Sequence, residues 1–70
     1  MEIDEVKEDR ILLKAATGSI RRTDEKGVVV EFSSQDVEIR NFEGKVKVVG
    51  GRIEFSGSSG GVEGADFKLE

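Results

Sequence analysis

The side chains able to do chemistry in this sequence are carboxylates, amines, guanidinium groups and hydroxyls. The 70 residues include 15 acidic and 11 basic ones, and histidine, cysteine, tyrosine and tryptophan do not occur. These absences exclude an imidazole base, a thiol nucleophile and a metal site built from cysteine or histidine. A pair of carboxylates can still perform acid–base catalysis, but only where a cleft raises the pKa of one member.

The adjacent acidic pairs Glu8-Asp9 and Asp24-Glu25 lie in segments that we predict to be turns, where solvated charge is expected. Neither pair has the ligand spacing of a calcium-binding loop. We therefore predict no catalytic, cofactor-binding or metal-binding residue, and we do not expect an enzyme.

Residues 56–61 form a serine- and glycine-rich segment whose backbone N–H groups could cradle an anion. The segment lacks the Lys-Ser/Thr ending of a phosphate-binding loop, and no helix start follows it. We predict a flexible connection rather than a binding site.

The elements that must position these groups are indicated by alternation of apolar and polar residues, which is typical of half-buried strands. The alternation occurs in residues 28–32, 36–40, 45–49 and 52–56. Gly50-Gly51 favours a two-residue hairpin turn, because both central positions of such a turn need positive φ. The expected pairs are Val49–Arg52, Val48–Ile53, Lys47–Glu54 and Val46–Phe55.

A four-residue loop over residues 41–44 would pair Ile39 with Val46 and Val37 with Val48. Together the two hairpins predict a three-stranded antiparallel meander over residues 36–56. Its rows would be Val37–Val48–Ile53, Ile39–Val46–Phe55 and, on the other face, Glu38–Lys47–Glu54. A turn at residues 33–35 would add the strand 28–32, with Val30 opposite Ile39.

The N-terminal third allows two interpretations. Residues 4–16 form either a helix, with an incomplete apolar stripe, or two short strands around a turn at residues 7–9. In the second case a further turn at Thr17-Gly18 leads into a strand over residues 19–22. Residues 23–27 form a turn in both cases, and residues 62–70 are expected to form a closing strand. We predict a single small β domain over residues 1–70. It is all-β, an antiparallel meander of about six short strands forming a barrel or a two-layer sandwich. The alternative is an α+β fold with a helix over residues 4–16.

No apolar run approaches the roughly 20 residues of a membrane-spanning helix, and the acidic residues 1–5 are unlike a signal peptide. We therefore expect a soluble, cytoplasmic protein with no membrane partner. A short sheet with open edges and no disulfide is expected to be completed by association. The expected function is a small non-catalytic structural or protein-interaction module that binds itself or another protein through sheet edges or an apolar face.

Three apolar residues are candidate contacts for such a partner. Phe42 lies in a predicted turn, where it either folds back over the end of the sheet or remains exposed as an anchor. Alternation points Val29 and Val49 outward among charged residues. A continuous Val29/Val49/Phe42 patch would mark an interaction surface.

The alternative function is nucleic-acid binding by a small β-barrel. Arg40, Lys45 and Arg52 would lie in one region of the sheet, and Arg21-Arg22 would add a second basic spot. The net charge of −4 opposes binding to a polyanion, and the predicted register places Lys47 between two glutamates. Nucleic acid is therefore the less favoured partner.

Overall fold

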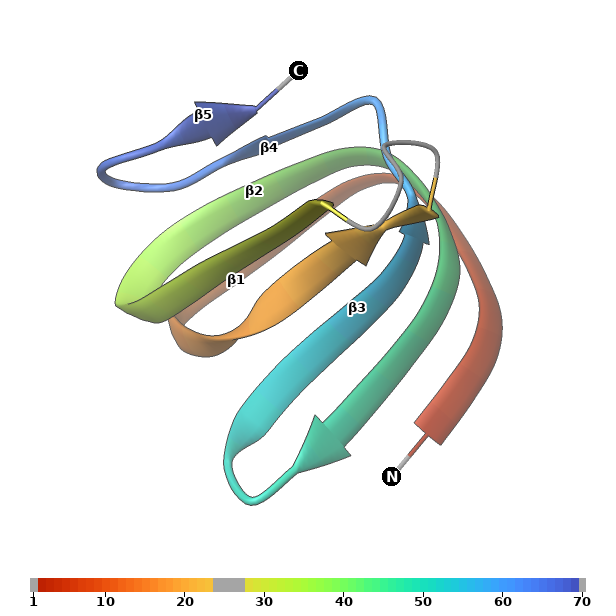
Figure 1. Cartoon of the computed structure of the whole chain (residues 1–70), viewed down its shortest axis with the longest axis horizontal. Coiled ribbons are helices and arrows are strands. Elements are labelled where there is room, and N and C mark those ends of the chain that lie inside the picture. The colour runs from red at the N-terminus through yellow and green to blue at the C-terminus, as the bar shows by residue number, and fades with distance from the viewer. Residues whose placement is uncertain (1, 24–27, 70) are drawn as a thin grey trace.

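The computed structural model describes residues 2–23 and 28–69, with side chains for residues 5–23 and 29–69. Within these ranges the protein is nearly all β and has no helix. The strands are β1 (Glu2–Arg22), β2 (Val28–Val49), β3 (Arg52–Ser58), β4 (Gly61–Glu63) and β5 (Lys68–Leu69) (Figure 1). The all-β prediction is confirmed. The alternative helix over residues 4–16 is wrong, because this segment lies within β1.

The five strands form one sheet in the order β1-β3-β2-β4-β5, and β1 also pairs with β2. β1 is antiparallel to β2 but parallel to β3, which it meets along residues 18–22. This parallel pairing departs from the antiparallel meander predicted from the sequence. The sheet is not closed, and neither the barrel or sandwich nor the count of six strands is confirmed.

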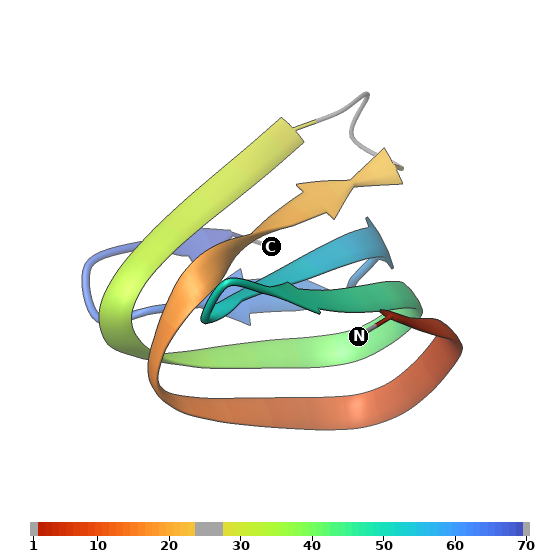
Figure 2. The same cartoon turned by 90° about the horizontal axis from the view of Figure 1, so that it is seen from below.

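Both long strands bend sharply, so the β1–β2 hairpin coils instead of extending (Figure 2). Among the described residues, four that are not glycine have positive φ: Glu5 (59°), Ala15 (48°), Ser34 (47°) and Asn41 (53°). The β1–β2 register shifts next to Glu5, Ala15 and Ser34, as expected for β-bulges. Each strand therefore turns a corner without ending.

The turns predicted at residues 33–35 and 41–44 are corners of this kind within β2. The predicted first hairpin of the meander is therefore wrong, because β2 continues where the chain was expected to reverse. Ile39 pairs with Ile11 of β1 instead of Val46, and Val30 pairs with Ile20 instead of Ile39. The turns expected within the N-terminal strands are wrong for the same reason, because β1 also continues.

Side chains accept the backbone N–H groups of the corner at Ala15 and Ser34. Ser34 N donates to Thr17 Oγ1 and Ala15 N donates to Asp36 Oδ1, both at 3.0 Å. Lys14 Nζ lies 3.6 Å from Asp36 Oδ2. These contacts satisfy backbone groups at a bend that interrupts the regular ladder.

The hydrogen bond from Ala15 N, together with the positive charge of Lys14, holds the pKa of Asp36 below its usual range. A carboxylate of this kind stabilises the protein above its unfolded-state pKa, and the contribution is lost as pH falls through the folded-state pKa. We expect the wild type to lose more stability than Asp36→Asn between about pH 7 and about pH 3. Urea unfolding of both proteins at the two pH values tests this, and equal losses would contradict it.

The hairpin between β2 and β3 has the predicted register. Gly50 and Gly51 form its turn with φ of 56° and 78°. The confirmed pairs are Val49–Arg52, Val48–Ile53, Lys47–Glu54 and Val46–Phe55. The predicted third members of these rows are wrong, because Val37, Glu38 and Ile39 pair with β1.

Among the residues whose side chains are described, eight apolar side chains are buried and form the core: Ile20, Phe32, Val37, Ile39, Phe42, Val46, Phe55 and Val62. Along β2, the buried residues Val37 and Ile39 are two positions apart, whereas Ile39 and Phe42 are three positions apart, on either side of the corner at Asn41. This shift places Phe42 on the inner face together with Ile39. The ring of Phe42 packs edge-on against Phe55, with centroids 5.4 Å apart.

Residues 56–61, predicted to be flexible, are held by hydrogen bonds. The chain runs in β3 as far as Ser58, and Ser59 is buried. Gly61 N donates to Ser59 Oγ at 3.1 Å, and Gly60 N donates to Arg40 O at 2.7 Å. Arg22, predicted to form a second basic spot with Arg21, is also buried and donates from Nη2 to Ser59 O at 2.8 Å.

The closing strand predicted over residues 62–70 is instead a small hairpin of β4 and β5. Val62 pairs with Leu69, and Gly64 N donates to Phe67 O at 2.9 Å across the turn. Most of the turn predicted at residues 23–27 lies outside the described residues.

Candidate functional site

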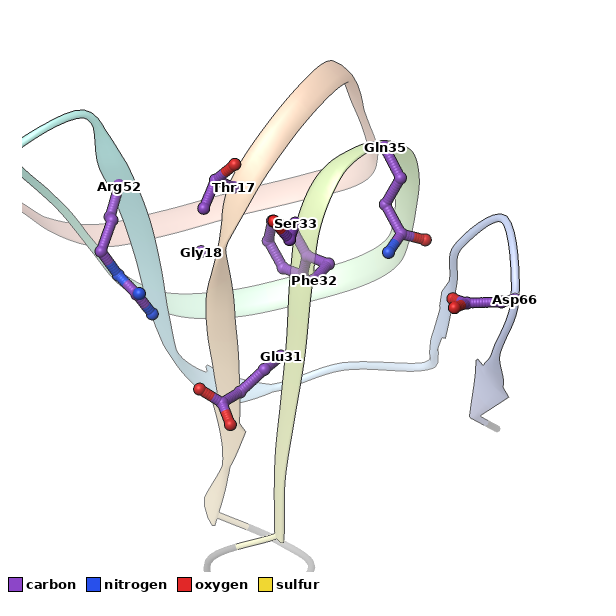
Figure 3. Close-up of a pocket in the computed structure, with 8 residues that line it drawn as sticks. All are labelled: Thr17, Gly18, Glu31, Phe32, Ser33, Gln35, Arg52 and Asp66. Carbon is purple, nitrogen blue, oxygen red and sulfur yellow. The ribbon is translucent and has the colours of Figure 1, made fainter.

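A polar hollow of about 390 Å³ lies beside the corner at Ser34 (Figure 3). It is lined by Thr17, Gly18, Glu31, Phe32, Ser33, Gln35, Arg52 and Asp66. Its charged side chains come from β2, from β3 and from the turn between β4 and β5. Figure 3 shows Glu31, Arg52 and Asp66 lying apart from one another around the hollow.

Two side-chain oxygens that line this hollow accept hydrogen bonds from backbone N–H groups of the fold. Thr17 Oγ1 accepts the N–H of Ser34, and Gln35 Oε1 accepts the N–H of Ala65 at 2.8 Å. Among the described residues, no group of three or more His, Cys, Asp and Glu side chains could hold a metal ion. We therefore interpret the hollow as structural, because hydrogen bonds of its lining residues connect the corner at Ser34 with the β4–β5 turn.

A second hollow, of about 420 Å³, runs beside β1 and is mainly apolar; we call it the β1 groove. It is lined by Val6, Ile11, Leu13, Val46, Ile53 and Phe55, together with Glu8, Arg10 and Leu12. From Glu2 to Ala16, β1 pairs with β2 on one side, and no other described strand pairs with it there. An unpaired strand edge beside an apolar surface can accept an additional strand.

The cations on this part of β1 form ion pairs with β2. Lys7, Arg10 and Lys14 are the three cations concerned. Their partners are Glu43 (3.6 Å from Lys7), Glu38 (paired with Arg10) and Asp36 (3.6 Å from Lys14). Lysines that project from an edge strand discourage pairing with another chain. Here the charged ends are directed toward β2, away from the open edge.

The candidate partner contacts do not form one patch. Phe42 is buried in the core and has no exposed surface, so a partner cannot contact it in this conformation. Val29 and Val49 are 46% and 49% exposed. Val29 lies opposite Arg21, however, and Val49 lies opposite Arg52 at the far end of the β2–β3 hairpin.

The candidate nucleic-acid contacts are also divided. Arg40 Nη1 lies 3.7 Å from Glu38 and 3.9 Å from Glu63, on the part of β2 that pairs with β4. Lys45 and Arg52 lie on the β2–β3 hairpin, opposite Ser56 and Val49. Arg40 therefore does not lie beside Lys45 and Arg52, in contrast to the single basic region that the sequence predicts.

The residues of the β1 groove were not candidates from the sequence. The signal that could have indicated them is the apolar triplet Ile11-Leu12-Leu13. A strand with one buried face cannot bury three successive side chains. Leu12 is 58% exposed, whereas Ile11 and Leu13 are half-buried on the inner face.

The described residues contain no helix long and apolar enough to cross a membrane. Comparison of this chain with protein-family models, curated proteins and solved structures finds no match.

Proposed function

We propose that the chain is a non-catalytic structural and protein-interaction module that associates with a second copy of itself through the β1 groove. The observation that carries this proposal is the open edge of β1 beside the apolar side chains of the groove. A 70-residue chain buries a smaller fraction of its surface on folding than a larger domain does, and this one has no cysteine to form a disulfide. Association would cover the apolar side chains that the fold leaves partly exposed. Cytoplasmic location stays part of the proposal.

Size-exclusion chromatography with light scattering, over a range of protein concentrations, tests the proposal. Mass must be measured by refractive index, because the chain has no tryptophan, tyrosine or cysteine to absorb near-ultraviolet light. We expect the mass to rise above that of one 7.6 kDa chain as concentration increases. A single-chain mass at every concentration would refute self-association.

The matched variants are Leu12→Lys, at the rim of the β1 groove, and Val49→Lys, outside it. The two side chains are exposed to a similar degree, 58% and 49%, so neither change should prevent folding. An unpaired lysine at the edge should oppose strand pairing. We therefore expect Leu12→Lys to lower the associated fraction and Val49→Lys to leave it unchanged.

Nucleic-acid binding is the second candidate, and the register of the outer sheet face favours it. Arg21, Ser56 and Lys45 lie in one row across three strands, and Lys47, its cross-strand partner Glu54 and Arg52 follow on the same face. Bound nucleic acid would add strong ultraviolet absorbance to the same chromatographic peak, and this absorbance would decline in high salt. Lys45→Glu combined with Arg52→Glu should abolish it if this face is responsible.

A further inference from the structure

We infer that two copies of this chain exchange the N-terminal part of β1, residues 2–14, which we call the β1 arm. In the exchanged dimer the arm of each copy pairs with β2 of the other copy, in the register that it has within one chain. Exchange of an identical element in this way is a low-cost route from a monomer to a dimer. The inference goes beyond the proposed function, because it uses the edge of β1 that pairs with β2 and not the β1 groove.

The β1 arm is attached to the sheet along one side. From Glu2 to Leu13 it pairs with β2, and among the described strands none pairs with its other edge. From Gly18 onward, in contrast, β1 lies between β2 and β3. Figure 2 shows the arm at the margin of the coiled hairpin, joined to the rest of β1 through a sharp bend. The arm can therefore leave without breaking a central strand, while residues 18–22 stay fixed in the sheet.

The bend between the β1 arm and the rest of β1 contains Ala15, whose φ is 48°. A residue with a side chain is strained in this left-handed region, and an extended backbone relieves the strain. Opening at Ala15 converts the corner into straight strand, so the strain favours the exchanged form, as it does for other strained hinges. The hydrogen bond from Ala15 N to Asp36 Oδ1 opposes opening, because the N–H group loses this acceptor.

The other three corners are unsuitable as hinges. Opening at Glu5 releases only the few residues before it. Ser34 and Asn41 lie on either side of residues 38–40 of β2, which pair with β1 and also with β4. Opening at either of these two corners separates strands on both sides of β2. Ala15 is therefore the corner at which a whole arm is released from one neighbour.

Apolar and charged contacts hold the β1 arm on the fold, and a second copy offers the same contacts. The apolar side chains of the arm that pack against the core are Val6, Ile11 and Leu13. The ion pairs between the arm and β2 include Lys7–Glu43 and Arg10–Glu38. An arm that has left its own fold exposes all of these groups. We therefore expect the open chain to be recaptured, by itself at low protein concentration and by a second copy at high concentration.

A disulfide between the arm and β2 reports exchange directly, and the chain has no native cysteine to interfere. Lys7 and Glu43 lie directly opposite each other and are both exposed, so Lys7→Cys combined with Glu43→Cys should fold. Opposite positions come close to the Cβ separation that a disulfide needs. The bond lies within one chain in the closed form and joins two chains in the exchanged form. After refolding from urea and mild oxidation, we expect the fraction of covalent dimer to increase with protein concentration. Lys7→Cys combined with Val49→Cys measures random cross-linking.

Substitutions at Ala15 in this double-cysteine protein test the hinge, because the Ala15 side chain is exposed and neither change disturbs packing. Glycine adopts positive φ without strain, so Ala15→Gly should favour the closed chain. Valine suits an extended strand, so Ala15→Val should favour exchange. We expect Ala15→Gly to lower the fraction of covalent dimer about fivefold or more, and Ala15→Val to raise it. Equal fractions in the two variants would overturn Ala15 as the hinge.

Two outcomes separate exchange from association through the β1 groove. Leu12 is exposed at the rim of the groove, so Leu12→Lys should leave exchange unchanged, and closed chains that associate through their grooves keep each disulfide within one chain. If the wild type associates but the double-cysteine protein forms only internal disulfides, exchange is wrong while the proposed function stands. Covalent dimers, together with wild-type association that survives Leu12→Lys, support exchange and refute the groove. A wild type that is monomeric at every concentration, with internal disulfides only, overturns both.

Discussion

Phe42→Ala is expected to lower the free energy of unfolding by about 3–5 kcal/mol. The side chain has no exposed surface, and its ring contacts that of Phe55 edge-on at 5.4 Å. A chain of 70 residues has a total stability of about 4–10 kcal/mol. The variant should therefore lose about a third or more of the stability of the protein and unfold at a much lower urea concentration. Urea unfolding followed by far-ultraviolet circular dichroism measures the effect.

Val29→Ala is the control for this prediction, because Val29 is 46% exposed. We expect it to cost about 0.5 kcal/mol or less, as surface substitutions usually do. Phe42→Leu should lie between the two, because it retains most of the buried apolar volume. If Phe42→Ala were no more costly than Val29→Ala, Phe42 would be outside the core and would again be a candidate contact for a partner.

Gly18→Ala is expected to be the most damaging single-methyl substitution at a strand junction. A Cβ atom at Gly18 would lie 1.8 Å from the backbone oxygen of Ile53. Neither backbone can yield locally, because β1 and β3 are paired in parallel at this point. The strands must separate, and we expect a loss of about 3 kcal/mol or more. Hydrogen exchange should show the loss of protection concentrated in residues 18–22 and 53–57.

Gly51→Ala separates this contact from the general effect of replacing glycine. Nothing lies within 4 Å of a Cβ at Gly51, but its φ is 78°. The expected cost is about 1–2 kcal/mol, from the left-handed backbone alone. Equal costs for the two variants would mean that β1 and β3 can separate at Gly18 without loss.

The β2–β3 hairpin could be predicted from the sequence because a single local feature determines it. Gly50-Gly51 permits the turn, and the apolar pairs on either side then fix the register. The pairing of β1 with β3 could not be predicted in this way. It joins Gly18 to Ile53, and no turn connects them.

The corners of β2 were mistaken for turns because both leave the same pattern in the sequence. A polar segment between two alternating runs, such as residues 33–35, occurs where a chain reverses and also where it bends. The two cases differ in backbone φ at one residue, here Ser34 or Asn41. Both residue types occur commonly in turns, so their identity could not distinguish the two geometries.

The sequence predicts that the candidate site is an open sheet edge, but it does not predict which strand provides that edge. Open sheet edges were expected of so short a sheet, but the edge that remains open depends on where β1 bends and pairs. Phe42 was considered as an anchor because it was assigned to a turn, and its burial follows from the corner at Asn41. The basic residues were separated for the same reason, since Arg40 and Lys45 lie on opposite sides of that corner.

The coiled hairpin also has a consequence for how quickly the chain can fold. The pairs that complete it join Glu2 to Lys47 and Gly18 to Ile53, so most of the chain must be ordered before these contacts form. Topologies dominated by such distant contacts fold slowly, because the entropy of loop closure is lost before the contacts compensate for it. The β2–β3 hairpin needs only its local turn. We therefore expect the β2–β3 hairpin to form first in folding. The strand β1, which has the open edge, is expected to pair only after this hairpin has formed.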